Sequence, residues 1–107
     1  MARAETNRRK LVIKSFGDRA SEDLYHGRRT SRARKFPEGT VRVALRKLDM
    51  LHAARRLEDL RVPPGNRLEN LGGDREGYCS IRVNDQWRVI FQWDGNDAYE
   101  VSVEDYH

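Results

Sequence analysis

The strongest constraint in this sequence is a hydrophobic pattern of period two that begins after Gly77 and continues to the C-terminus. Such alternation is typical of β-strands with one buried face, because successive side chains point to opposite sides. Residues typical of turns interrupt the pattern twice, at positions 84–86 and 94–96. The pattern therefore predicts three strands joined as an antiparallel meander, over Tyr78–Val83, Gln86–Trp93 and Asp97–Asp105.

The length of each loop determines which residues of these strands lie opposite each other. A two-residue turn at Asn84 and Asp85 would place Arg82 opposite Trp87 and mix polar with apolar faces. Three-residue loops keep the faces separate, so we predict them in both hairpins. The resulting pairs are Val83 with Trp87, Ile81 with Val89 and Arg82 with Arg88 in the first hairpin, and Phe91 with Tyr99, Val89 with Val101 and Trp87 with Val103 in the second.

This register predicts a sheet with one dry face and one polar, partly cationic face. The dry face comprises Ile81, Val83, Trp87, Val89, Phe91, Tyr99, Val101 and Val103. The polar face carries Arg82, Arg88 and Ser102 in a row, with Ile90, Glu100 and Glu104 nearby. The dry face needs a cover, and the first half of the chain can provide it.

The first half of the chain predicts one strand and two helices. Residues 11–16 are apolar and β-branched, as in a short strand. A short helix fits between Asp18, a good N-cap, and the helix-ending Gly27. A longer helix begins at Pro37 and runs to about Arg56, with one apolar face at helical spacing formed by Val41, Ala44, Leu45, Leu48 and Leu51. The predicted fold class is α+β: an N-terminal strand, two helices, then a three-stranded antiparallel meander packed on the helices.

Length and composition limit the chain to one highly charged domain. Its 107 residues support a single modest core, and 36% of them are charged. No apolar run approaches the ~20 residues of a membrane span. We therefore expect no membrane association. The single cysteine, Cys79, cannot form an internal disulfide, which predicts a cytoplasmic protein. Residues 1–11 are polar, basic and aperiodic, which predicts a disordered extension before a domain spanning residues 12–107.

Positive charge is concentrated in the first third of the chain. Residues 1–35 contain eleven Lys and Arg against four acids, whereas residues 36–107 contain ten against thirteen. Part of this charge lies in Arg28–Lys35, a connector without apolar spacing that we predict to be a loop. The concentration favours a polyanionic partner such as nucleic acid, and a solvated tail and helix face would explain it equally well.

Several motifs occur in order toward the C-terminus. They are GNRLE at positions 65–69, GDREG at 73–77, SIRVNDQWRV at 80–89 and DYH at 105–107, and VIKSF at 12–16 precedes them. Together they resemble the HigB family of toxins, the killer components of bacterial toxin–antitoxin pairs within the RelE-like group. The resemblance covers residues 12–107.

The resemblance implies the toxin of a type II toxin–antitoxin system, an endoribonuclease that cleaves mRNA in the ribosomal A site and so inhibits translation. It also implies a HigA-like antitoxin of the helix-turn-helix class, with operator DNA bound only through the toxin–antitoxin complex, and no cofactor. The alternative is a catalytically weak RelE-like binding module that serves as antitoxin partner and operator co-regulator. A stand-alone DNA-binding protein fits less well, because the chain lacks a helix-turn-helix signature and its last strands are acidic.

The last three residues supply proton-transfer chemistry. Metal-free RNA cleavage needs a base for the 2′-hydroxyl, an acid for the departing 5′-oxygen and cations for the phosphate. His107 titrates nearest neutrality, and Asp105 can orient it or act as base. Tyr106 can stack on a nucleobase, position the phosphate or donate a proton. No spacing of His, Cys, Asp and Glu resembles a metal site, which favours a metal-independent reaction.

Arginines complete the predicted site. Arg88 supplies fixed positive charge beside the acid–base groups, and further phosphate contacts are predicted for Arg67, Arg75 and Arg82. Glu69 stands where some members of the family carry a histidine, and Gly72 where they carry a lysine. Glu69 can be the general base, or it can hold an arginine in place. We expect His107 to lie close to Arg88 and to face an open groove.

Overall fold

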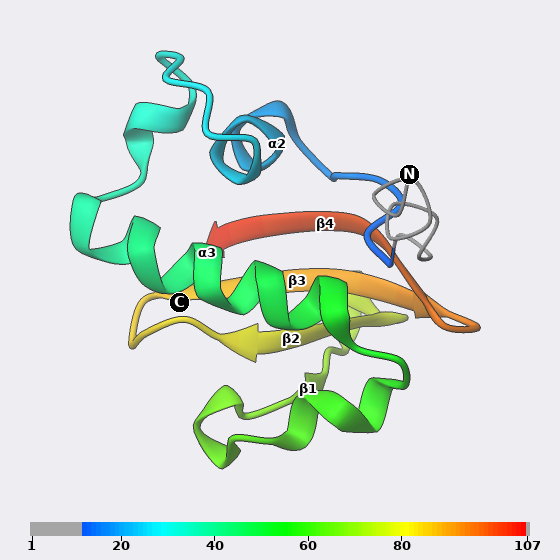
Figure 1. Ribbon diagram of the computed structural model, residues 1–107. Helices are drawn as coiled ribbons and strands as arrows, with labels where there is room; N and C mark the ends of the chain where they lie inside the picture. The colour runs from blue at the N-terminus through cyan, green and yellow to red at the C-terminus, as the bar shows by residue number, and fades with distance from the viewer. Residues whose placement is uncertain (1–11, 107) are drawn as a thin grey trace, which may run out of the picture.

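The computed structural model describes residues 12–106 and has an α+β architecture, as predicted. One layer is an antiparallel sheet of order β1-β2-β3-β4, and α3 crosses one face of it (Figure 1). The helices and strands are α2 Arg19–Tyr25, α3 Glu38–Ala53, β1 Glu69–Asn70, β2 Tyr78–Arg82, β3 Trp87–Asp94 and β4 Asp97–Asp105. The predicted meander is β2-β3-β4, and the two-residue β1 adds a fourth strand beside β2. The predicted disordered extension lies outside the described residues.

Both helices begin where the sequence predicts. Asp18 caps α2, since its Oδ1 accepts a hydrogen bond from the backbone N–H of Ser21 at 2.7 Å, and Gly27 follows the helix with a positive φ of 73°. The prediction that α3 continues to about Arg56 was wrong, because it ends at Ala53. The backbone N–H groups of residues 55 and 56 donate instead to Oδ2 of Asp59, which lies in the 3-10 turn Leu57–Arg61 that follows.

Over its described residues, 12–16, the predicted N-terminal strand forms two isolated parallel pairs with β4, Ile13 with Ala98 and Phe16 with Val101. Backbone hydrogen bonds secure both ends of the segment; Lys14 N–H, for example, donates to Ala98 O at 2.8 Å. Between the two pairs, Glu100 of β4 has a positive φ of 52°. This irregular residue explains why the described part of the segment forms no continuous ladder with β4.

The register of the first hairpin is confirmed, and that of the second was wrong. Ile81 lies opposite Val89, as the three-residue loop requires. In the second hairpin, however, Asp94 lies opposite Asp97 across a two-residue turn, in which Gly95 adopts φ +65°. Val89 faces Val103, two residues further along β4 than predicted; the shorter turn accounts for one residue of this shift and a β-bulge for the other.

The shorter turn alone would exchange the two faces of β4, and a β-bulge restores them for the residues that follow it. Ile90 pairs with Ser102 and Gln92 with Tyr99, so β4 has one more residue than β3 between these pairs. Beyond the bulge the valines of β4 keep the dry face. Before it the faces are exchanged, so Ala98 is fully buried and Tyr99 lies on the other face, contrary to the prediction.

The hydrophobic core lies between the sheet and the two helices. Its fully buried members include Ala44, Leu48, Leu51, Ile81, Val89, Phe91, Ala98, Val101 and Val103. Trp87 is 7% exposed and packs edge-on against Phe36, which follows the basic connector, with ring centroids 5.4 Å apart. The core thus fixes β3 and the segment before α3 relative to each other.

Candidate active site

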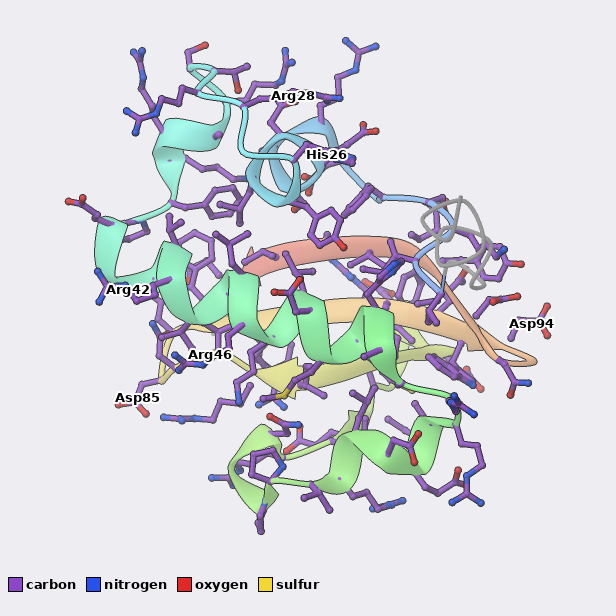
Figure 2. All side chains as sticks on the ribbon, in the orientation of Figure 1. His26, Arg28, Arg42, Arg46, Asp85 and Asp94 are labelled. Atoms are coloured by element: carbon purple, nitrogen blue, oxygen red, sulfur yellow. The ribbon has the colours of Figure 1, made fainter. Side chains whose placement is uncertain are left out.

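An open pocket of about 230 Å³ lies where the first hairpin meets the end of β4. Its lining residues are Arg67, Glu69, Arg82, Asn84, Asp85, Arg88 and Tyr106. We call it the arginine pocket; Asp85 marks its position in Figure 2. Five of the eight predicted site residues line it, although they come from four separate parts of the chain.

Arg88 is the most enclosed cation of the arginine pocket, being 8% exposed. Its Nε donates to the hydroxyl of Ser80 at 2.8 Å, and its Nη2 donates to the backbone carbonyl of Arg67 at 2.7 Å. Arg67 can present this carbonyl because its backbone is left-handed, with φ 46°, just after the 3-10 turn Pro64–Asn66. Both acceptors are neutral, so the charge of the guanidinium is not cancelled by its strongest contacts.

Two further side chains contact the Arg88 guanidinium. The ring of Tyr106 lies 5.6 Å from it, within range of a cation–π interaction, and is 42% exposed in total. Oε1 of Glu69 lies 3.8 Å from Nη2 of Arg88, an ion pair at the long end of the range. The side chain of Glu69 is 45% exposed, so solvent screens this pair. The pocket therefore stays receptive to an anion.

Arg82 lies opposite Arg88 in the strand register and forms an ion pair with Asp85. Because the Asp85 side chain is almost fully exposed, this pair contributes little free energy. An incoming phosphate can replace Asp85 at low cost. Arg82 can thus add a second positive charge beside that of Arg88.

The turn that carries Asp85 is held by Asn84, which sequence reasoning missed. Oδ1 of Asn84 accepts hydrogen bonds from the backbone N–H groups of Gln86 and Trp87 at 2.9 and 2.8 Å. Its Nδ2 donates to the hydroxyl of Thr40 on α3 at 3.1 Å. An asparagine at the start of a hairpin loop is a signal for such a turn, and here it also anchors the turn to the helix.

Ser80 is the other residue that sequence reasoning missed, and it is fully buried. It precedes Arg82 by two residues and therefore lies on the same face of β2. That face relationship was available from the alternation, but the contact with Arg88 depends on the side-chain geometry. A buried hydroxyl beside two predicted phosphate-binding arginines is the signal that could have identified it.

Arg75 does not line the arginine pocket. Its Nη2 lies 2.5 Å from Oε1 of Glu104, and its guanidinium carbon lies 5.5 Å from the ring centre of Tyr78. The other carboxylate oxygen of Glu104 accepts a hydrogen bond from the hydroxyl of Ser102 at 2.6 Å. This network, rather than the pocket, determines the position of Arg75.

The end of β4 is linked to the first hairpin through Gln86. Nε2 of Gln86 donates to Oδ2 of Asp105 at 2.9 Å, and the backbone N–H of Tyr106 donates to the carbonyl of Gln86 at 2.6 Å. Asp105 is exposed and does not line the pocket. His107 lies outside the described residues, so its expected proximity to Arg88 stays a prediction.

A larger hollow of about 530 Å³ lies away from these residues, beside α2. Tyr25, His26 and His52 line it, but Nδ1 of His52 accepts a hydrogen bond from the backbone N–H of Ile13 at 3.3 Å. His52 therefore ties the N-terminal segment to α3. Burial raises the pKa of Tyr25, as does the nearby carboxylate of Asp49, so its phenol stays protonated at neutral pH.

The part of the chain that the structure describes holds neither a metal-binding cluster nor a membrane-spanning helix. Within residues 12–106, no three His, Cys, Asp or Glu side chains are grouped so that they could hold a metal ion. Neither α2 nor α3, the two α-helices of this range, has the length and apolar character that a membrane crossing requires.

Comparison with known proteins places the sequence in a family. Residues 14–107 match the family described as RelE-like toxin of type II toxin-antitoxin system HigB. Toxin HigB-1 of Vibrio cholerae is 47% identical over 78 residues, which are 73% of this chain and 80% of that protein. Endoribonuclease HigB of Proteus vulgaris is 54% identical over 41 residues, which are 38% of this chain and 45% of that protein.

Solved structures share the fold at low sequence identity. The YoeB–YefM complex from Staphylococcus aureus contains a chain with a TM-score of 0.56 and 18% identity, over 92% of this chain and 98% of that one. The YoeB dimer from the same organism gives 0.51 and 20%, over 91% and 97%. At these identities the likeness concerns the fold alone. The family match and the Vibrio relative, by contrast, show that this chain belongs to the HigB family of RelE-like toxins of type II toxin–antitoxin systems.

Proposed function

We propose that this protein is a cytoplasmic endoribonuclease that cleaves mRNA on the ribosome and thereby inhibits translation. The observation that carries the proposal is the arginine pocket, in which Arg88 is oriented by neutral acceptors and its charge is open to an anion. The Proteus relative, named an endoribonuclease, supports the choice of RNA as substrate. A fixed cation that meets no strong counter-charge suits a phosphate that gains negative charge during reaction.

The proposed reaction is an in-line attack by the 2′-oxygen on the adjacent phosphorus. The 2′-oxygen–phosphorus bond forms, the bond from phosphorus to the 5′-oxygen breaks, and the products are a 2′,3′-cyclic phosphate and a 5′-hydroxyl. A base takes the proton of the 2′-hydroxyl, and an acid protonates the departing 5′-oxygen. His107 and Asp105 carry these transfers in the proposal. The reaction needs no metal ion, since Arg88 and Arg82 balance the charge on the phosphate.

Tyr106 and Glu69 have supporting roles in this proposal. The exposed ring of Tyr106, stacked near Arg88, can receive a nucleobase or position the phosphate. Glu69 lies within ion-pair range of Arg88, which favours the role of orienting the arginine over that of general base. Arg67 offers its exposed side chain to the RNA backbone at the rim of the pocket. Arg75 binds RNA only if its pair with Glu104 opens.

The proposal includes an antitoxin. Membership of a toxin–antitoxin family supports a protein partner that neutralises this chain, and we propose a HigA-like helix-turn-helix protein. The fold neighbour YoeB was solved in complex with YefM, which supports such pairing for this fold. Operator DNA would be bound through the complex, because the antitoxin carries the DNA-binding helices.

A second candidate is a binding module with little catalytic power. The specific observation in its favour is the carboxylate of Glu69 beside Arg88, since it offsets part of the charge that a phosphate needs. In that case the chain would act as antitoxin partner and operator co-regulator. The two candidates differ in what happens when the toxin is made without its antitoxin.

Induced expression without antitoxin tests the proposal. We expect growth arrest by the wild-type chain and relief by Arg88→Ala and by His107→Gln. Arg61→Ala is the matched control, because Arg61 is exposed and lies outside the pocket. Sequencing of cleaved mRNA ends should show 5′-hydroxyl termini only in strains that make active toxin.

The outcomes separate the candidates. No arrest by the wild-type chain, at a level of protein that still captures antitoxin, would favour the binding module. Equal arrest by wild type and both site variants would reject the assignment of the site. Arrest without mRNA cleavage would reject the nuclease.

A further inference from the structure

A buried carboxylate organises the basic connector that precedes α3. Asp23, on α2, is 3% exposed. Its Oδ1 accepts a hydrogen bond from Nη1 of Arg28 at 3.3 Å, and its Oδ2 accepts bonds from Oγ1 of Thr30 at 2.8 Å and Nε of Arg32 at 3.0 Å. We call residues Arg28–Lys35 the basic loop. Three of its side chains thus converge on one acceptor group.

Backbone contacts and charge reinforce this arrangement. The backbone N–H of Arg28 donates to the carbonyl of Asp23 at 2.9 Å, and Oγ1 of Thr30 accepts from the N–H of Ala33 at 3.2 Å, where a 3-10 turn starts. The Thr30 hydroxyl, helped by Arg28 and Arg32, lowers the pKa of Asp23 although burial opposes this. The anchor is therefore ionised at neutral pH and the loop has a defined shape.

The basic loop directs more positive charge outward than Asp23 neutralises. It contains five Arg and Lys residues. Arg28 and Arg32 keep 54% and 49% of their side chains exposed while paired. Arg29, Arg34 and Lys35 are exposed, and within residues 12–106 their side chains form no hydrogen bond or ion pair. The loop is thus a surface of adjacent, mostly unneutralised cations.

The shape of this surface indicates the kind of ligand. Its residues line neither the arginine pocket nor the hollow beside α2. Exposed cations spread along a loop match the repeating phosphates of a nucleic acid backbone. Because Asp23 already orders the loop, binding costs less conformational entropy than it would in a flexible tail. A connector that served only solubility would not need a buried anchor.

We propose that the basic loop is a second RNA-binding surface, which holds the phosphate backbone of a folded RNA while the arginine pocket holds the scissile phosphate. This inference rests on the proposed function, from which it takes RNA as the target. In Figure 2 Arg28 lies at the top of the molecule and Asp85 at its lower left, so the two surfaces contact separate stretches of RNA. The contacts are with phosphates and are therefore independent of sequence.

Binding to a fluorescently labelled RNA duplex tests the proposal apart from catalysis. All proteins carry Arg88→Ala, so that cleavage plays no part. Adding Arg29→Gln and Arg34→Gln should weaken binding about tenfold and reduce the slope of log Kd against log salt by about 2, one for each lost phosphate contact. The matched control is Arg55→Gln with Arg61→Gln, which removes the same charge from exposed sites elsewhere and should change neither quantity.

Three results would overturn the proposal. Unchanged duplex binding by the loop variant would show that the loop contacts no RNA. Equal losses of duplex affinity in the loop and control variants would show that net charge, and not the loop, determines binding. Unchanged RNA binding with weakened antitoxin binding would assign the loop to the protein partner. None of these readings depends on whether the wild-type chain is a nuclease, which the growth assay decides separately.

Asp23→Asn separates the organisation of the loop from its charge. The substitution removes a negative charge, so simple electrostatics predicts tighter binding of the duplex. If the anchored shape matters, binding should weaken severalfold instead, because the loop loses its ionic anchor. Tighter binding by a variant whose circular dichroism and thermal unfolding show a folded protein would reject the role of Asp23. If the variant does not fold, the arginine variants still decide the proposal.

Discussion

At the scale of single residues, the chemistry available to Arg88 depends on neutral oxygen atoms more than on carboxylates. The hydroxyl of Ser80 and the carbonyl of Arg67 fix two edges of the guanidinium. A strong carboxylate pair would hold it equally well, but such a pair would compete with a phosphate for the same charge. The partially exposed Glu69 at 3.8 Å is a weak competitor. This combination of firm orientation and open charge is what a phosphate-binding arginine requires.

Ser80→Ala should disturb this arrangement without removing any charge. The Nε of Arg88 would lose its acceptor in a buried position, which costs about 1–3 kcal/mol of folding stability. We also expect RNA cleavage to slow about tenfold, mainly in kcat, since the arginine would lose orientation rather than charge. Urea unfolding and single-turnover cleavage measure the two effects, and the pH profile of cleavage should keep its shape because no titrating group changes.

Ser102→Ala is the matched control for Ser80→Ala. Ser102 is a buried serine on the same sheet, but its hydroxyl donates to Glu104. We expect a comparable loss of stability and nearly normal cleavage. If both variants lose the same cleavage activity, the effect of Ser80 is one of general stability and the positioning role is wrong.

At the scale of elements, the second hairpin shows what alternation could and could not predict. The pattern of valines correctly assigned Val89, Val101 and Val103 to the dry face. It could not reveal that a two-residue turn and a bulge would together give β4, beyond the bulge, the same faces as a three-residue loop. The register of the second hairpin affects the site, because it places Glu104 opposite Arg88. Glu104 in turn forms an ion pair with Arg75, which keeps Arg75 out of the pocket.

The bulge predicts an unusual response to substitution at Glu100. Its positive φ of 52° disfavours β-branched residues, so Glu100→Val should destabilise the fold by about 1–2 kcal/mol although valine is a good strand former. Glu100→Asn should be better tolerated, because asparagine adopts left-handed backbone more readily. Both variants lose the hydrogen bond from Ser15 to the carboxylate, so their difference isolates the backbone effect. Equal unfolding midpoints in urea would contradict the assignment of the bulge.

At the scale of the whole molecule, the fold was more predictable than the site. Helix starts, strand alternation and the α+β class follow from local patterns, and the structure confirms them. The site depends on contacts between distant segments, such as Ser80 with Arg88 and Asn84 with Thr40, which alternation does not specify. Of the five predicted residues that meet in the pocket, Arg82 and Arg88 are brought together by the confirmed register of the first hairpin.

The whole molecule should lose stability in acid through Asp59 and Asp23. Hydrogen bonds from the backbone N–H groups of Arg55 and Arg56 lower the pKa of Asp59, and the Thr30 hydroxyl with two arginines lowers that of Asp23. Since both folded pKa values lie below the unfolded value near 3.9, their contribution is present above that pH and is lost as the pH falls through the folded values. Urea unfolding at pH 7 and at lower pH should show this loss.

Asp59→Asn is the comparison for the acid experiment. It should be less stable than wild type at pH 7 and should lose less stability on acidification, since one titrating group is gone. A pH dependence identical to that of the wild-type chain would show that Asp59 contributes nothing to it.

The carbonyl of Arg67 that holds Arg88 has a consequence for any mutational survey of this protein. Alanine scanning replaces side chains and leaves peptide oxygens where they are, so it would register only the Ser80 half of the support for Arg88. Arg67→Gly should preserve the left-handed turn and the direction of the oxygen, whereas Arg67→Val should misdirect it. Both variants lose the same arginine side chain, so the difference between them isolates the backbone effect. If position 67 tolerates glycine but not valine, the backbone carbonyl of this residue contributes to the site.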